Sequence, residues 1–242
     1  MSKGLCLSLF CFNALAIHAQ EVSTQMWYEY MLNLPFGKNY NMENAFTYST
    51  TATGPLWRAY DYSLCLEKSI NSHLDLLAQS VFSYTNQTST FNTFEVRPIV
   101  GGRIHFTPNR RIQTRLLLRL EYRNFKNLDT KSWSHVVRPR ARAEVIFPIN
   151  NASYSSDKTW YAITDLELLY NVEDVRERFA NRLRIRIGGG YRLNHKFRFE
   201  VLFMSQQSRE AIESQFETTD NIFRIRIKHF LLQSSNLNGT GN

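Results

Sequence analysis

Hydrophobic and polar residues alternate with a period of two along most of the 242-residue chain. The clearest example is ANRLRIRIGGGYRLNHKFRFEVLF, residues 180–203, in which three arginines alternate with leucine and isoleucine before a short turn. After the turn, phenylalanine and valine alternate with arginine and glutamate. Side chains of a strand point to opposite faces in turn, so this pattern predicts strands with one apolar and one charged face.

Eleven segments of the chain show the same alternation. They cover residues 24–34, 40–49, 58–68, 73–84, 93–106, 111–125, 135–147, 160–170, 181–192, 196–203 and 221–230. Most are roughly ten residues or longer, whereas strands of soluble proteins average about 5–6 residues and tilted membrane strands need about 9–11. No linker or change of composition divides them, which predicts one all-β domain, an antiparallel transmembrane β-barrel.

The strand count requires an argument beyond the alternation. Eleven segments are visible, but single-chain barrels of bacteria have an even number of strands. We therefore predict about twelve strands, with ten as the alternative, and the connector PINNASYSSDK at 148–158 is where a strand could be missed.

The N-terminus has the three parts of a secretory signal peptide. Met-Ser-Lys is followed by the apolar run GLCLSLFCFNALAI and then by His-Ala-Gln. The run is too short to span a bilayer, and cleavage is expected between Ala19 and Gln20. The predicted organisation is a signal peptide at 1–19, a barrel at 20–232 and a polar tail at 233–242.

Two orientations of the strands are conceivable. A secreted soluble barrel would bury the apolar face, whereas a membrane barrel turns it toward lipid and encloses the charges. The predicted export, the strand length and the aromatic residues near strand ends favour the membrane barrel, and arginine and glutamate at matching positions could pair inside a narrow lumen. The predicted lumen-lining residues are Arg115, Arg119, Glu121, Arg138, Arg140, Arg142, Glu144, Asp165, Glu167, Arg182, Arg184, Arg186, Glu200, Arg224 and Arg226. Glu95 is expected as a further acidic partner of these arginines.

Charge and cysteine content add little to this interpretation. The net charge of +8 would suit nucleic acid, anionic lipid or acidic solutes. Nucleic acid is excluded because its stacking platforms need aromatic and cationic side chains on the same face. Cys65 is the only cysteine beyond the signal peptide, so no disulfide framework is expected, and an ordinary strand residue is the favoured interpretation.

No motif for chemistry stands out. The histidines beyond residue 19 show no spacing typical of a nucleophile or metal site, and Gly188–Gly190 lies inside a predicted strand rather than in a phosphate loop. We therefore expect no catalytic residue, no metal and no cofactor. Glycine at this place would permit bending or close packing of the strand.

Five stretches carry a resemblance to a known family: WYEYMLNLPF, RPIVGGRIHFTPNRRIQTRLLLRLEYRNF, RPRARAEVIFPI, ERFANRLRIRIGGGYRL and TDNIFRIRIKHF. Over nearly its whole mature length the chain resembles a family of small outer-membrane β-barrels of Bacteroidota, known as a domain of unknown function. The resemblance implies a barrel in the bacterial outer membrane. It supplies no activity and no catalytic residues.

Three functions follow from these observations. The first is a structural or porin-like outer-membrane barrel, in contact with lipid, which would favour small anionic solutes if its lumen is open and conduct nothing if ion pairs fill it. The second is a lipid-modifying membrane enzyme, and the third is a secreted soluble barrel that binds a ligand. We expect the first, a barrel without enzymatic activity; the sequence identifies no protein partner.

Overall fold

The computed structural model describes residues 22–53, 56–87, 92–108, 110–170, 182–208 and 217–231, and all regular elements among them are strands. No helix in this part of the chain is long and apolar enough to cross a membrane. The strands are β1 (Ser23–Phe36), β2 (Tyr40–Thr53), β3 (Trp57–Asn71), β4 (Leu74–Gln87), β5 (Thr93–His105), β6 (Gln113–Asn127), β7 (Trp133–Pro148), β8 (Thr159–Leu169), β9 (Arg182–Arg192), β10 (Phe197–Ser208) and β11 (Glu217–Phe230).

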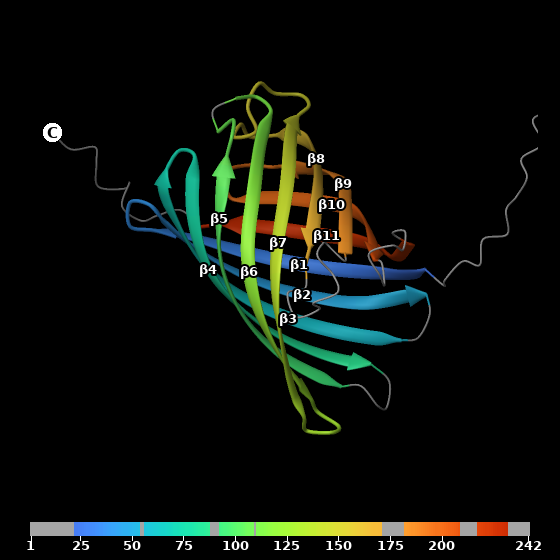
Figure 1. The fold of residues 1–242 in the computed structure, drawn as a ribbon. Coiled ribbons are helices and arrows are strands. Elements are labelled where there is room, and N and C mark those ends of the chain that lie inside the picture. Colours follow the sequence, from blue (N-terminus) through green and yellow to red (C-terminus); the bar gives the residue numbers. More distant parts are fainter. Residues whose placement is uncertain are drawn as a thin grey trace, which may run out of the picture.

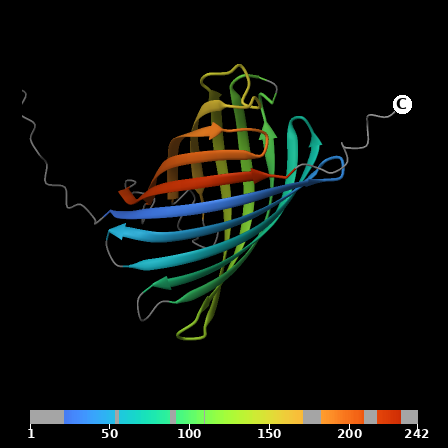
Figure 2. The same cartoon turned by 180° about the vertical axis from the view of Figure 1, so that it is seen from behind.

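The strands form one closed barrel in which each strand pairs with its neighbours in the chain and β1 pairs with β11 (Figure 1). Ten of the strand pairs are antiparallel, and the β1–β11 pair that closes the ring is parallel. Figure 2 shows this closing pair from behind, with β1 (blue) beside β11 (red).

The described residues form eleven strands, which is close to the predicted count of about twelve but equals neither twelve nor ten. In a ring of purely antiparallel neighbours the strand directions must alternate, and only an even number can close. One parallel pair removes that restriction. Each of the eleven alternating segments is a strand, and the connector at 149–158 contains none.

The parallel pair places the first and last strands in the same direction. The connectors 37–39, 72–73, 106–112, 149–158 and 193–196 lie at one end of the barrel, which we call the turn end. β1 begins at the opposite end, the loop end, and β11 finishes at the turn end. The predicted signal peptide (1–19) and polar tail (233–242) lie outside the described residues.

The two faces of the barrel wall differ in the way the alternation predicts. In β9, Ile185 and Ile187 are exposed on the outside, whereas Arg186 is buried inside. Among the described residues, 37 large hydrophobic side chains are exposed, while Glu95, Glu121, Glu144, Glu167 and Glu200 are buried. A soluble protein shows the opposite distribution, because charged groups are almost never fully buried without a partner.

Aromatic side chains gather on the outer face near both ends. Tyr28, Tyr48, Tyr60 and Tyr84 are consecutive partners across β1–β4, with ring centroids 6.3 Å apart for the first pair and 5.2 Å for the second. At the turn end, the rings of Trp160 and Tyr191 lie 4.6 Å apart.

Glycine allows neighbouring strands to approach closely at two positions of the wall. A Cβ atom added at Gly188 would lie 2.3 Å from the carbonyl oxygen of Val201, and one added at Gly101 would lie 2.3 Å from that of Leu118. No other side chain fits at such distances. The three glycines of 188–190 lie within β9, and Gly188 illustrates the close packing predicted for them.

Candidate functional site: the charged lumen

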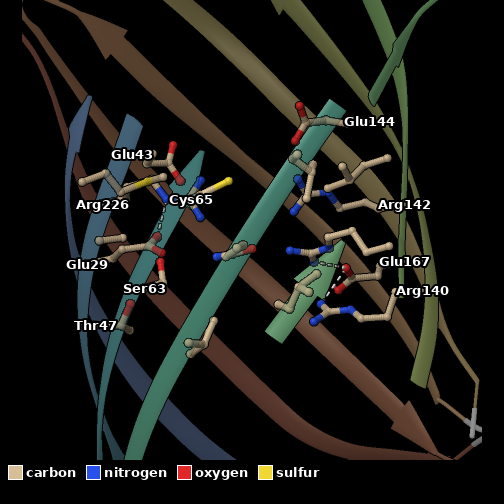
Figure 3. Close-up of a pocket in the computed structure, with 18 of the residues that line it drawn as sticks. Glu29, Glu43, Thr47, Ser63, Cys65, Arg140, Arg142, Glu144, Glu167 and Arg226 are labelled. Atoms are coloured by element: carbon tan, nitrogen blue, oxygen red, sulfur yellow. Dashed lines mark hydrogen bonds and ion pairs between the residues drawn. The ribbon is translucent and has the colours of Figure 1, made fainter. Parts of the chain in front are cut away.

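A cavity of about 560 Å³ occupies the lumen and is lined by side chains from all parts of the wall (Figure 3). Within the described chain, fifteen arginine or lysine and eight aspartate or glutamate side chains line it. Cations therefore outnumber carboxylates around the cavity. Its size lies within the range of about 300–1,000 Å³ that is usual for ligand pockets.

The structure brings the residues predicted from the alternation together. Fourteen of the fifteen line this cavity. The fifteenth, Glu200, is buried behind it, where its carboxylate accepts from Arg226 at 3.0 Å and from Lys228 at 2.9 Å. Every second residue of a pleated strand points inward. Once the charged face is assigned to the lumen, the direction of all side chains on that face follows.

A chain of ion pairs crosses β6, β7 and β8. Glu121 is wholly buried and binds Arg138 at 2.7 Å and Arg140 at 2.5 Å. Arg140 also binds Glu167 at 2.6 Å, and Arg119 reaches the same carboxylate at 3.3 Å. Each guanidinium thus bridges strands, and each carboxylate is held by at least two cations.

A second chain lies beside it and extends to β9. Glu144 accepts from Arg115 and lies 3.5 Å from Arg186, which in turn binds Asp165 at 2.5 Å. Charge-assisted bonds of this kind are short and strong, and the surrounding pairs restrict their side chains.

The parallel closing pair has its own ion pairs. Glu29 of β1 binds Arg226 of β11 and lies 3.7 Å from Arg224. Arg226 also forms an ion pair with Glu200, and Glu200 accepts a hydrogen bond from the hydroxyl of Tyr161 at 3.0 Å. These bonds join the first and last strands on the inner face.

Further inward charges, among them Arg97, Arg103, Arg123 and Glu67, were not among the predicted lumen residues, whereas Glu95 was predicted as an acidic partner of the arginines. On β5, Glu95 binds Arg97 at 2.7 Å and Arg123 of β6 at 2.6 Å. Arg103 binds Glu67 at 2.6 Å. These residues occupy the same inward-facing positions of the alternation as the predicted ones. The same pattern, applied to every strand of the chain, therefore identifies them.

One end of the lumen is filled by the connector between β7 and β8. Tyr154 is buried there against the ring of Tyr161, with centroids 4.7 Å apart and the planes nearly perpendicular. Arg198 donates to the hydroxyl of Tyr154 at 2.8 Å. Ile146, Ile163 and Leu202 complete an apolar cluster around the two tyrosines. We define the plug as Tyr154, Tyr161 and these three residues. The connector has no strand pattern and gave no sequence signal for the burial of Tyr154, whereas the other four residues occupy inward positions of β7, β8 and β10.

The wall formed by β2, β3 and β4 differs from the rest. Glu43 and Asp61 line the cavity, yet neither lies within 4 Å of a cation of the described chain. Beside them, Cys65, Leu77, Val81, Ile99 and Leu117 form a buried apolar cluster that extends to β6. Cys65 is a free thiol within this cluster, on the inner face.

The histidines outside the predicted signal peptide have separate environments. His105 of β5 contacts Asp75 at 2.7 Å, near the turn end. His229 contacts the hydroxyl of Tyr30 at 2.7 Å across the closing pair.

These features define a class: a closed all-β barrel with an apolar outer face and a charged, partly filled lumen. The chain belongs to the family described as "Protein of unknown function (DUF2490)", whose model matches residues 24–217. That match covers all but the last strand of the barrel. No curated protein matches the chain significantly.

Proposed function

We propose that this protein is a bacterial outer-membrane β-barrel, without enzymatic activity, whose lumen is closed by its own ion pairs and plug. The observation that carries the proposal is the inverted distribution of side chains, apolar outside and charged inside. A continuous apolar surface around a whole barrel is far larger than the patches of a few hundred Å² on soluble monomers. In lipid the same surface is stable, and the closed ring satisfies every backbone group of the strands.

The outer face also has the features of a membrane-facing surface. The strands are 11 to 16 residues long, sufficient for a tilted crossing. The tyrosine row near the loop end and the Trp160–Tyr191 pair at the turn end match the two aromatic girdles of outer-membrane barrels. Outer-membrane lipid is therefore the partner that this surface would contact.

A closed lumen is favoured over an open one. Ion pairs connect side chains across the cavity wall, and the Tyr154 plug fills the space beside them at the turn end. Small barrels of this kind are generally filled by side chains. A structural role follows, with no continuous ion pathway at rest.

An anion-favouring porin is the second candidate, and one observation supports it. Fifteen cationic against eight acidic side chains line the cavity within the described residues. If the plug moved aside, this excess would attract small anions and repel cations. The relation to Bacteroidota stays a prediction.

The membrane proposal is tested by expressing the full chain in a bacterium with an outer membrane and separating the cell fractions. We expect the protein in the outer-membrane fraction, retained there after washing at high salt and high pH. Recovery in the soluble periplasmic fraction would contradict the proposal.

The closed lumen is tested by planar-bilayer recordings of the refolded protein and its Tyr154→Ala variant. We expect almost no conductance from the parent protein and discrete channels from the variant. Tyr84→Ala, which removes an exposed outer-face ring, is the matched control. Steady conductance by the parent would instead favour the porin.

A further inference from the structure

We propose that the lumen cavity is a binding site for a zwitterionic solute of amino-acid or short-peptide size. The solute's carboxylate would bind Arg142 and its ammonium group would bind Glu43, while Asp61 on the adjacent strand adds negative charge to the same wall. This inference goes beyond the structural role proposed above, because it assigns a ligand class and two contacting residues to the cavity.

The unpaired charges of the cavity are divided between its two sides. Six of the eight carboxylates that line it are within 4 Å of a cation in the described chain. The two without such a cation, Glu43 and Asp61, lie on the adjacent strands β2 and β3. Three arginines line the cavity without an ion pair among the described residues: Arg142, Arg182 and Arg198. Arg182 is exposed and Arg198 donates to the hydroxyl of Tyr154, whereas the buried Nε of Arg142 has no hydrogen-bond partner there. Figure 3 shows Arg142 and Glu43 on opposite sides of the cavity.

This separation is energetically unfavourable in the free protein. Burying an unpaired charge destabilises a protein unless another group compensates it. Elsewhere in the lumen, neighbours such as Arg140 and Glu167 bind each other at 2.6 Å. A solute with opposite charges at its two ends would compensate both sides of the cavity at once, which neither a simple anion nor a simple cation can do.

The space between the two charged sides suits a small polar solute. Ser63, Thr47 and Gln79 line it near Glu43 and can exchange hydrogen bonds with peptide groups. The apolar residues Leu77 and Val81 lie on the same wall and offer contact to a small aliphatic side chain. Among the described charges, a carboxylate alone would gain Arg142 but would face repulsion from Glu43 and Asp61.

Binding is measured with the refolded protein in detergent micelles, by titration calorimetry with alanine, dialanine, trialanine and tetra-alanine. Trp27 lines the cavity and provides a second readout through its fluorescence. For the peptide that binds best, the N-acetylated form lacks the ammonium group and the amidated form lacks the carboxylate. We expect each of these forms to bind about tenfold more weakly than the peptide with free ends, because each loses one charge-assisted contact.

The variants assign the two ends of the solute. In Arg142→Met, the free peptide and its amide should bind with equal affinity, because the arginine no longer recognises the carboxylate. In Glu43→Gln, the difference between the free and the N-acetylated peptide should shrink by several-fold. Arg110→Met and Glu217→Gln, at exposed positions, should leave both differences unchanged.

The proposal is overturned if no peptide of the series binds, or if the free and capped forms bind equally. Tight binding of the N-acetylated form, unaffected by Glu43→Gln, would indicate a simple anion site and would also overturn it. The peptide series on the parent protein decides the matter even if a variant fails to fold. Because the titration is done in micelles, a lack of binding would leave the outer-membrane proposal untouched. A soluble protein in the cell fractions would likewise leave the binding result untouched.

Discussion

Two walls of the same barrel differ in whether their inward carboxylates form ion pairs. On β6–β9, inward carboxylates such as Glu121 and Glu167 are each held by two or more arginines. On β2 and β3, Glu43 and Asp61 face the cavity with no cation of the described chain within 4 Å. The alternation that turns them inward is the same in both places. The difference shows that an inward charge can stabilise the barrel on one wall and remain available for binding on the other.

The largest expected effect comes from breaking the paired wall. Glu121→Gln removes the negative charge that Arg138 and Arg140 share, and leaves two buried guanidinium groups without it. Loss of one partner of a buried pair costs about 3–5 kcal/mol. We expect the free energy of unfolding by urea, measured in lipid vesicles, to fall by about that amount. A change below about 1 kcal/mol would mean that the pairs contribute little.

A smaller effect is expected when a charge is placed on the outer face. Val201→Arg puts a guanidinium at an exposed position of β10 that we assign to lipid, where such a substitution costs about 2–4 kcal/mol near the bilayer midplane. Ser63→Arg, which adds the same group between Glu43 and Asp61 in the lumen, should leave stability unchanged or raise it. Equal losses in urea unfolding would contradict the assignment of the two faces.

The plug offers a third comparison. A Cβ atom at Gly190 would lie 2.4 Å from the ring of Tyr161, which is fully buried and bonded to Glu200. Gly190→Ala should therefore destabilise the protein by about 1–3 kcal/mol and produce channels in planar-bilayer recordings. Gly189→Ala, whose Cβ would meet only the Tyr161 carbonyl at 3.7 Å, should do neither. If Gly190→Ala neither lowered stability nor produced channels, the plug would not depend on the position of this ring.

The smallest effect is expected on the unpaired wall. Glu43→Gln removes a charge that has no cation of the described chain within 4 Å, so stability should be unchanged or rise by roughly 1 kcal/mol. The measurement is the same urea titration as for Glu121→Gln, and the two variants differ only in the partners of the carboxylate. A loss as large as that of Glu121→Gln would mean that Glu43 has a stabilising partner.

The alternation of the sequence was sufficient to predict the strands and the direction of their side chains. In β9 and β11, for example, every second residue is arginine or lysine over several positions, and no other regular structure gives that period. The number of strands was not predictable in this way, because the parallel pairing of β1 with β11 depends on where the ring closes. Local pattern carries no information about that closure.

The sequence did not predict which parts of the lumen are filled by side chains and which form the cavity. Tyr154 lies in an irregular connector, and its burial follows from the fold of that connector over Tyr161. Leu77 and Val81 face inward although they are apolar, since the parity of β4 and not their hydropathy decides their direction. The register between strands decides which carboxylates form ion pairs with arginines, and the alternation does not specify this register.

Site-directed spin labelling tests directly whether the outer face of the barrel lies in lipid. With Cys65 replaced by serine, a nitroxide is attached at Ile185→Cys on the outside or at Thr47→Cys in the lumen, and the protein is reconstituted in vesicles. We predict that the label at 185 collides frequently with oxygen and rarely with a water-soluble nickel chelate. A label at 185 that is shielded from oxygen by packed protein, or freely reached by the chelate, would contradict the account.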